Sequence, residues 1–246
     1  MTLTNHILDA WHLIVPPRGN PHGPLPPLLL LLTFVTGLVD AFSYLMLGHV
    51  LVANMTGNVV FLGFAVGGAP GFIWWASLLA IGTFLAGAVL GGRLETTVGH
   101  HRGRHLFLTA IAETVLVALS LLAAWQAAAP YEGWVLALLI ALLGVALGLQ
   151  NATARALAVP DLTTTVLTLT ITGIAADSRA AGGQNSKIGR RLVPISSMFL
   201  GGLVGALLVV GGHDLWTLAV ATGVLAVVVI GALGPSRSRA SWVSKK

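Results

Sequence analysis

The sequence predicts an all-α polytopic membrane protein with about six transmembrane helices, two re-entrant or broken helical segments, and an inverted-topology repeat. Composition is the first observation, because 56% of the 246 residues are hydrophobic and 9% are charged. A water-soluble domain of this size needs more charge to cover its surface. The second observation is a series of apolar runs close to the roughly 20 residues that span a bilayer. The third is a polar break that recurs in the two halves of the chain.

Six apolar segments have the length and composition of full crossings. They cover residues 27–47, 72–92, 106–126, 133–155, 192–212 and 214–234. Two further segments differ in kind. In 50–66 the unbroken apolar run after Asn58 is only eight residues long, and in 161–177 a Thr stands at nearly every second or third position early in the segment. We expect each of these two to cover half a span as a re-entrant or broken helix.

The basic residues favour six crossings over eight. With six crossings and the N-terminus inside, the basic loops and the basic tail are all cytoplasmic: 93–105, 178–191 and 235–246. This agrees with the positive-inside rule, with Arg155 at an inner membrane end as the partial exception. Eight crossings would place three arginines outside: Arg93, Arg102 and Arg104. The net charge of +5 is therefore a topology signal and gives no indication of nucleic-acid binding.

We expect one transmembrane domain, residues 27–234, between a flexible N-terminal tail at 1–26 and a basic tail at 235–246, both cytoplasmic. Within the N-terminal tail, residues 5–15 fit a short interfacial helix as well as a disordered segment. The chain has no Cys, which excludes disulfides and thiolate metal sites. The motif HHRGRH at 100–105 has no acid nearby, and we interpret it as a solvated inner loop, not a metal site.

The two halves of the chain, about 27–126 and 133–234, share a pattern. The stretch TGLVDAFSYLMLGHVLVANMTGN (36–58) aligns with LGLQNATARALAVPDLTTT (147–165), and FLAGAVLGG (84–92) resembles FLGGLVGAL (199–207). In this alignment Asp40 matches Asn151 and Asn54 matches Asp161. Three crossings in each half is an odd number, so the second half is upside down relative to the first. Paired breaks in inverted repeats face each other near the midplane and are the best sequence indication of a binding site.

The break in the first half contains Asn54, Thr56 and Asn58. Irregular backbone at membrane depth is tolerated only where protein or a watery cavity satisfies it, and these side chains can satisfy backbone groups near Gly57. Asp40 is the most informative single residue, because an unpaired acid in the membrane costs at least about 2.5 kcal/mol. It lies on a polar stripe of the first crossing with Thr33, Thr36 and Ser43. The alternative is that Asp40 only packs against the break.

In the second half we expect Pro160, Asp161 and Thr163 to start a helix, with Pro at the first turn and Asp or Thr as the cap. Asp161, Thr165, Thr168 and Thr172 form a second polar stripe. Glu113, one turn after Thr109, is either a proton carrier or an acid that reaches the inner interface. Asn151 and Arg155 lie one turn apart, and Arg155 is either a partner of Asp40, Glu113 or Asp161, a ligand for an anionic solute, or an inner anchor.

Small residues four apart are expected to let helices pack closely: Gly87 with Gly91, and Gly201 with Gly205. The candidate residues for binding a solute or ion are Asp40, Asn54, Thr56, Asn58, Glu113, Asn151, Arg155, Asp161, Thr163, Thr164 and Thr165.

These residues favour a secondary transporter or channel for a small solute, with a site between two opposed breaks and a proton as one candidate ion. The alternative is a membrane scaffold or assembly partner that transports nothing. No nucleophile–base pair, Walker loop or dinucleotide motif is visible, so we expect neither an enzyme nor a cofactor or metal site. The partners we expect are the lipid bilayer and a small solute or proton, with no nucleic acid. The sequence leaves open whether the chain forms a homo-oligomer.

Two stretches carry a resemblance to a known family. GLVDAFSYLMLGHVLVANMTGNVVFLGFA and GLQNATARALAVPDLTTTVLTLTITGIAADS are similar to the two signature regions of the YoaK-like family of bacterial integral membrane proteins, which are grouped under a domain of unknown function. The resemblance covers roughly residues 27–234. It implies a multi-pass protein of the bacterial inner membrane with about six crossings, and it supplies no substrate.

Overall fold

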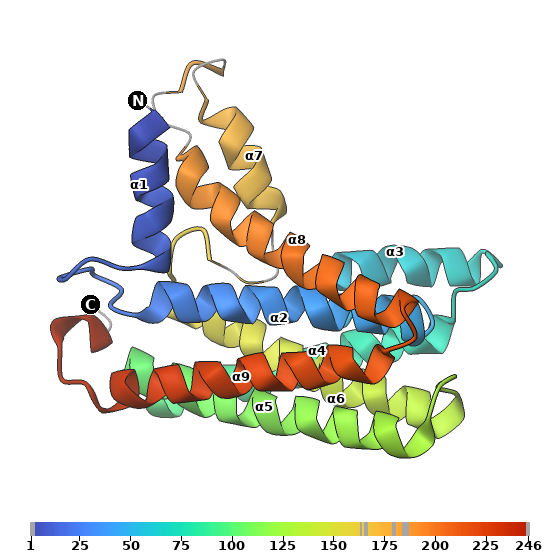
Figure 1. The fold of residues 1–246 in the computed structure, drawn as a ribbon. Helices are drawn as coiled ribbons and strands as arrows, with labels where there is room; N and C mark the ends of the chain where they lie inside the picture. Colours follow the sequence, from blue (N-terminus) through green and yellow to red (C-terminus); the bar gives the residue numbers. More distant parts are fainter. Residues whose placement is uncertain (1–2, 163, 165–166, 179–180, 184–186, 245–246) are drawn as a thin grey trace.

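The computed structural model describes residues 3–162, 164, 167–178, 181–183 and 187–244. Within these residues the chain forms nine α-helices and one short 3-10 helix (Figure 1). The elements are α1 (Leu3–Ile14), α2 (Leu25–Met46), α3 (Met55–Val66), α4 (Trp74–Val98), α5 (Arg102–Ala127), α6 (Gly133–Leu157), α7 (Thr168–Ala176), α8 (Ile188–Val210), α9 (Asp214–Arg237) and η2 (Ser241–Val243).

Six helices are long and apolar enough to cross a membrane, which confirms the predicted all-α polytopic fold. They are α2, α4, α5, α6, α8 and α9. α3 has 12 residues and α7 has 9, so both are too short to span a bilayer as helices. Several helices extend beyond the predicted apolar segments. α8 begins at Ile188, which brings Arg190 and Arg191 from the expected loop into its first turn.

The spanning helices of the two halves pack in matching pairs. α2 packs against α8 as α6 packs against α4, and α2 packs against α9 as α6 packs against α5. α5 and α9, the last helices of each half, pack against each other. In Figure 1 the bundle helices lie side by side, while α1 and α7 project from one flank of the bundle beside the first turns of α8. Exchanging the two halves leaves this list of packed helices unchanged, as an inverted repeat requires.

Glycines bring the α2–α8 and α4–α6 pairs into backbone contact. A Cβ atom at Gly201 would overlap the carbonyl oxygen of Phe34, and one at Gly87 would overlap that of Val145. The same contacts correct the predicted register by one residue. Gly87 and Gly91 correspond to Gly201 and Gly205, so Phe84 matches Met198 and not Phe199. The reason is that the repeat preserves close backbone approach, whereas Phe199 is an exposed side chain.

The contacts also give the direction of each helix. Ser197 of α8 donates a hydrogen bond to the carbonyl oxygen of Leu30 at 2.8 Å, and Gly201 and Gly205 follow along Phe34 and Leu38, so α2 and α8 run parallel. Arg102 at the start of α5 bonds the carbonyl oxygen of Leu157 at the end of α6, so these two run antiparallel. The chain therefore returns to the same end of the bundle after α3, and again after α7.

The two ends of the bundle differ in charge. We call the end that carries the α4–α5 turn and both chain termini the basic end, and the other end, whose connections lack Lys and Arg, the opposite end. At the basic end the C-terminal segment folds back, since His101 pairs with Ser244 in a β-bridge and Trp242 lies against Gly23. At the opposite end the Tyr131 hydroxyl donates to the Asp214 carboxylate at the start of α9.

Candidate functional site

The first break is a re-entrant segment held against α2 by side-chain hydrogen bonds. The Asp40 carboxylate accepts from the backbone N–H of Ala53 at 3.0 Å, and the Ser43 hydroxyl accepts from that of Val52 at 3.4 Å. Ala53 is thus bonded to a residue farther from the C-terminal end of α2 than the residue to which Val52 is bonded. Asp40 lies six residues before the end of its helix, so the chain turns back by about 9 Å at 1.5 Å per residue. Ala53 and Val52 are buried in this position.

Two asparagines complete the first break. Asn54 is the N-cap of α3, where its side chain accepts from the N–H of Gly57 at 3.3 Å, as the sequence predicts. Asn58 is buried and bonds both backbone groups of Leu51, accepting from its N–H at 2.9 Å and donating to its carbonyl oxygen at 2.6 Å. Thr56 is exposed in the first turn of α3. Asp40 and Asn58 therefore satisfy backbone groups that an irregular segment leaves unpaired in a membrane.

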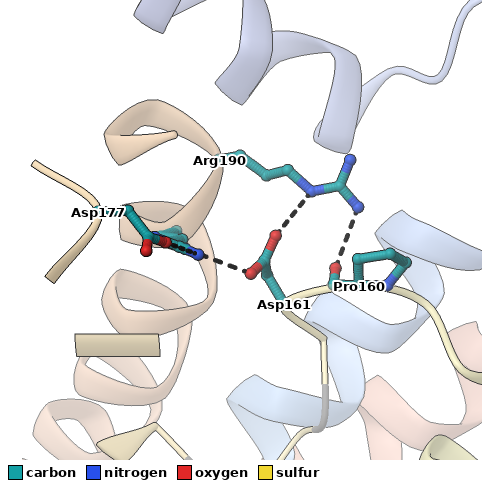
Figure 2. Close-up of polar contacts among 5 residues, drawn as sticks. Pro160, Asp161, Asp177 and Arg190 are labelled. Carbon is teal, nitrogen blue, oxygen red and sulfur yellow. Dashed lines mark hydrogen bonds and ion pairs between the residues drawn. The ribbon is translucent and has the colours of Figure 1, made fainter. Parts of the chain in front are cut away.

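The second break is built differently, and the prediction of a helix start at Pro160–Thr163 is wrong. α7 begins at Thr168, after Leu167, and has no side-chain cap. Asp161 adopts a positive φ of 64° and turns its carboxylate to the start of α8. There it pairs with Arg190 at 3.1 Å and with Arg191 at 3.4 Å (Figure 2). Two guanidinium groups satisfy this carboxylate with charge-assisted bonds, and it does not cap α7.

The Asp161 cluster extends to both sides. Arg190 also donates to the carbonyl oxygen of Pro160 at 3.0 Å, and Arg191 pairs with Asp177 at 2.8 Å, after the last turn of α7 (Figure 2). Arg155, one of whose predicted partners was Asp161, forms no ion pair with it in the described part of the chain. Thr164 is buried, with a positive φ of 60°. Two predicted site residues, Thr163 and Thr165, lie outside the described residues.

A groove opens at the basic end, between α4 and α6. It has a volume of about 540 Å³ and is lined by Glu95 on α4 and by Asn151 and Arg155 on α6, with Phe84 and small residues completing the lining. Asn151 is the repeat counterpart of Asp40, and it is half-buried where Asp40 is 8% exposed. No hydrogen bond of Asn151 to another described residue is present. Asp40 closes the first break, whereas its counterpart Asn151 lines an open groove in the second half.

A chain of buried polar side chains crosses the core between α5, α6 and α2. The Nε2 of His105 lies 3.2 Å from the Thr153 hydroxyl, which lies 2.8 Å from the Thr109 hydroxyl. One turn earlier on α6, the Gln150 side-chain amide donates to the Thr36 hydroxyl at 2.8 Å. All of these side chains are at most 1% exposed. The stripe on α2 predicted from the sequence therefore continues into the neighbouring helices.

Glu113 is fully buried on α5, one turn after Thr109. Thr109 on α5 and Thr153 on α6 are bonded to each other, and the two helices run antiparallel. The residue one turn after Thr109 therefore lies at the same level as the residue one turn before Thr153. This register places Glu113 level with Gln150. Neither carboxylate oxygen of Glu113, nor the side-chain oxygen of Gln150, has a hydrogen-bond partner among the described residues. Of the two interpretations from the sequence, the burial excludes an acid that reaches the interface.

The interpretation of HHRGRH as a solvated loop is wrong for two of its residues. Arg102 is 7% exposed and bonds the carbonyl oxygen of Leu157 at 2.6 Å, and His105 is fully buried. The first turn of α5 begins inside the motif, and packing against the end of α6 removes these side chains from water. Arg102 also lies 3.0 Å from Nδ1 of His22. Burial, and then the charges of Arg102 and Arg190, lower the pKa of His22.

The predicted site residues therefore separate into four places, one of which is the second break with Asp161 and Thr164. Asp40, Asn54 and Asn58 close the first break, Asn151 and Arg155 line the groove, and Glu113 is in the core. Sequence reasoning missed Gln150, Thr153 and His105. A search for polar residues three or four apart in the 133–155 crossing would have found Gln150 and Thr153. The pairing of Asp161 with Arg190 and Arg191 joins segments far apart in the chain, and no local pattern indicates it.

Comparison with known proteins gives one family and one named relative. The family model described as "Protein of unknown function (DUF1275)" matches residues 28–231. The chain is 32% identical over 155 residues to the UPF0700 transmembrane protein YoaK of Bacillus subtilis (strain 168). That match covers 61% of this chain and 65% of the relative, which is slightly less than two thirds of its length. No solved structure matches.

Proposed function

Because this chain belongs to the family described as "Protein of unknown function (DUF1275)", its function has to be argued from its own residues, and we propose that it is a secondary transporter or channel for a small solute. The observation that carries the proposal is the difference between the repeat-related breaks. The first is bonded shut against α2 through Asp40 and Ser43, while the groove beside Asn151 is open. One closed and one open site at repeat-related positions is what alternating access requires of a protein in one of its states.

The groove has the size and chemistry of a solute site. Its 540 Å³ falls in the range of about 300 to 1,000 Å³ that is typical of small-molecule pockets. An acid, a base and an amide line it, Glu95, Arg155 and Asn151, and this set suits a small polar solute with both donor and acceptor groups. We infer that the basic end is cytoplasmic, by the positive-inside rule, so the open groove faces the cell interior of a bacterial inner membrane.

Single cysteines at repeat-related positions test the proposal, because the chain has no native Cys. Ala152 lines the groove, and Ala41 is its counterpart on α2. In everted vesicles and intact cells, a membrane-impermeant thiol reagent is expected to label Ala152→Cys from the basic side and to leave Ala41→Cys unlabelled from both sides. His100→Cys, at an exposed position in the α4–α5 turn, is the control for access of the reagent.

A transporter also predicts that the two positions respond oppositely. Adding Asp40→Ala removes the bond that closes the first break, so labelling of Ala41→Cys from the opposite side is expected to rise while labelling of Ala152→Cys falls. If His100→Cys reacts and Ala152→Cys does not, the groove is closed and the proposal fails. If His100→Cys and Ala152→Cys both react, but Asp40→Ala does not change the labelling of Ala41→Cys and Ala152→Cys in opposite directions, alternating access fails.

The second candidate is a membrane scaffold that transports nothing, and the closed first break favours it. Asp40 bonds the backbone of Ala53, which is the packing role that a scaffold predicts for this acid. The same labelling experiment separates the two functions, because a scaffold predicts that Asp40→Ala lowers stability without changing the reactivity of Ala152→Cys.

A further inference from the structure

We propose that Glu113 is a proton-binding site that exchanges its proton with the basic end through Thr109, Thr153 and His105, and that this proton is the ion coupled to solute movement. The inference rests on the proposed transport function for its coupling part only. Proton binding at Glu113 can be measured without any solute.

The Glu113 side chain lies in an environment that favours a bound proton. It is fully buried in a spanning helix, and neither of its oxygens has a hydrogen-bond partner among the described residues. A charged carboxylate in this position would be desolvated and unpaired, which is the most costly arrangement for an acid in a membrane. A proton on Glu113 removes that cost, and intramembrane acids with this environment typically act in proton transfer.

Polar side chains provide a route for the proton between the basic end and Glu113. From the basic end, His105 leads to the Thr153 hydroxyl at 3.2 Å, and Thr153 to the Thr109 hydroxyl at 2.8 Å. Each of these groups can both donate and accept a proton in a hydrogen bond. Thr109 is four residues, about 6 Å of rise, from Glu113 on the same helix, a distance that a single water can bridge. At the basic end, Arg102, which precedes His105 by one turn of α5, lines a surface cavity of about 710 Å³ together with His22.

Toward the opposite end of the bundle, polar side chains lead from the level of Glu113 to the first break. Gln150, level with Glu113, bonds Thr36, and Thr36 is one turn from Asp40 on the same helix. Asp40 in turn accepts from Ala53 in the closed first break. The proton therefore has a polar path to the basic end, while the path to the opposite end stops at the bond that closes the first break. Solute and proton would then reach their sites from the same side in this state.

Few other ionisable groups lie near the level of Glu113 on the helices of the bundle. Along α5 the nearest is His105, and on α2 it is Asp40. The parts of α6 and α9 packed against α5 at this level carry none, since Arg155, Asp214 and Arg237 lie near helix ends, and α4 contributes Arg93 and Glu95 near the basic end. His22 titrates at the basic end. A pH response of the core is thus expected to come from Glu113, with His22 as the group to control for.

Infrared spectroscopy of the protein in lipid nanodiscs tests proton binding directly. We expect a carbonyl band of a protonated carboxyl group that shifts to lower frequency in D₂O. Glu113→Gln should remove this band, Glu113→Asp should keep an exchangeable one, and Asp40→Asn should leave it in place. The absence of an exchangeable band that depends on Glu113 would overturn the proposal. The Asp variant keeps the test valid if the Gln variant is poorly folded.

The route is tested by the rate of hydrogen–deuterium exchange at that band. Thr109→Val combined with Thr153→Val keeps side-chain volume but removes both hydroxyls, and exchange is expected to slow by about tenfold or more. Thr217→Val is the matched control, because Thr217 is a fully buried threonine on α9 outside the route. Equal rates in the double variant and the wild type would overturn the route.

The coupling is tested with Ala152→Cys. Its labelling rate, divided by that of His100→Cys to correct for thiol ionisation, is expected to change between about pH 5 and pH 9, a range in which proteins titrate buried acids. Glu113→Gln should abolish this change, whereas His22→Gln should not. A change that survives Glu113→Gln would overturn the coupling while the infrared band still reports on the proton site. An unreactive Ala152→Cys would instead contradict the proposed function.

Discussion

The two breaks occupy matching positions of the repeat but are held by different chemistry. In the first half a carboxylate on the spanning helix binds the backbone of the returning segment, Asp40 to Ala53. In the second half the corresponding pair is Asn151 and Pro160. Proline has no backbone N–H, so the bond that closes the first break cannot form in the second. A single residue type can thus deny one member of a repeated pair the backbone hydrogen bond that holds the other member closed.

The acid in the second break serves a different surface. Asp161 is in the returning segment itself and binds Arg190 and Arg191, which start α8 at the basic end. The first break has no corresponding cluster, because the connections at the opposite end lack basic residues. One break is therefore fastened in the buried interior of the bundle and the other near its surface. This difference predicts how strongly, and under which conditions, each break is held.

The largest effect is expected where the two halves are alike, at the glycines of the α2–α8 and α4–α6 contacts. Gly87→Ala and Gly201→Ala each place a Cβ against a backbone carbonyl of the partner helix, of Val145 and Phe34 respectively. We expect each to lower stability by about 1–3 kcal/mol or more, by overpacking. The measurement is the thermal transition of purified protein in detergent, followed by gel filtration.

Neighbouring glycines are the controls for this prediction. A Cβ at Gly92 meets nothing within 4 Å, and one at Gly202 meets only a carbonyl oxygen at 3.9 Å. Gly92→Ala and Gly202→Ala should therefore leave the transition nearly unchanged or raise it slightly. If Gly87→Ala were tolerated while Gly201→Ala was not, the two helix pairs would not be equivalent.

The next effect separates the two breaks. Asp40→Ala leaves the Ala53 N–H unpaired in the membrane and is expected to cost about 1–3 kcal/mol. Asn151→Ala, at the repeat counterpart, removes no hydrogen bond to a described residue and should change stability by less than about 0.5 kcal/mol. The thermal transitions of the two variants, measured side by side, give the difference. Equal losses would mean that Asn151 closes the second break as Asp40 closes the first.

The sequence predicted the fold well because composition, apolar length and charge placement all follow from the bilayer. It predicted the first break for a similar reason, since Asn54 and Asn58 satisfy backbone within a few residues of themselves. It failed for the second break, where Asp161 has a strong local signal for capping a helix but is captured by arginines about 30 residues away. It also missed Gln150 and His105, whose roles depend on the packing of three helices.

The smallest effect is expected at the second break, and its salt dependence sharpens the comparison. Asp161 and its arginines are partly exposed, with side-chain exposures of 15–29%, so Asp161→Asn should cost no more than about 1 kcal/mol. That loss should shrink between about 0.1 M and 1 M NaCl, since the Debye length falls from about 10 Å to 3 Å. The loss in Asp40→Ala should stay constant, because the bond to Ala53 is shielded from ions. Asp177→Asn, which leaves Asp161 paired with both arginines, is the control for general charge effects. The opposite result would be a loss of stability that depends on salt in Asp40→Ala and does not depend on salt in Asp161→Asn. It would mean that the first break is held near the surface and the second in the interior. The bond from Asp40 to Ala53 would then no longer explain why the first break is the closed one.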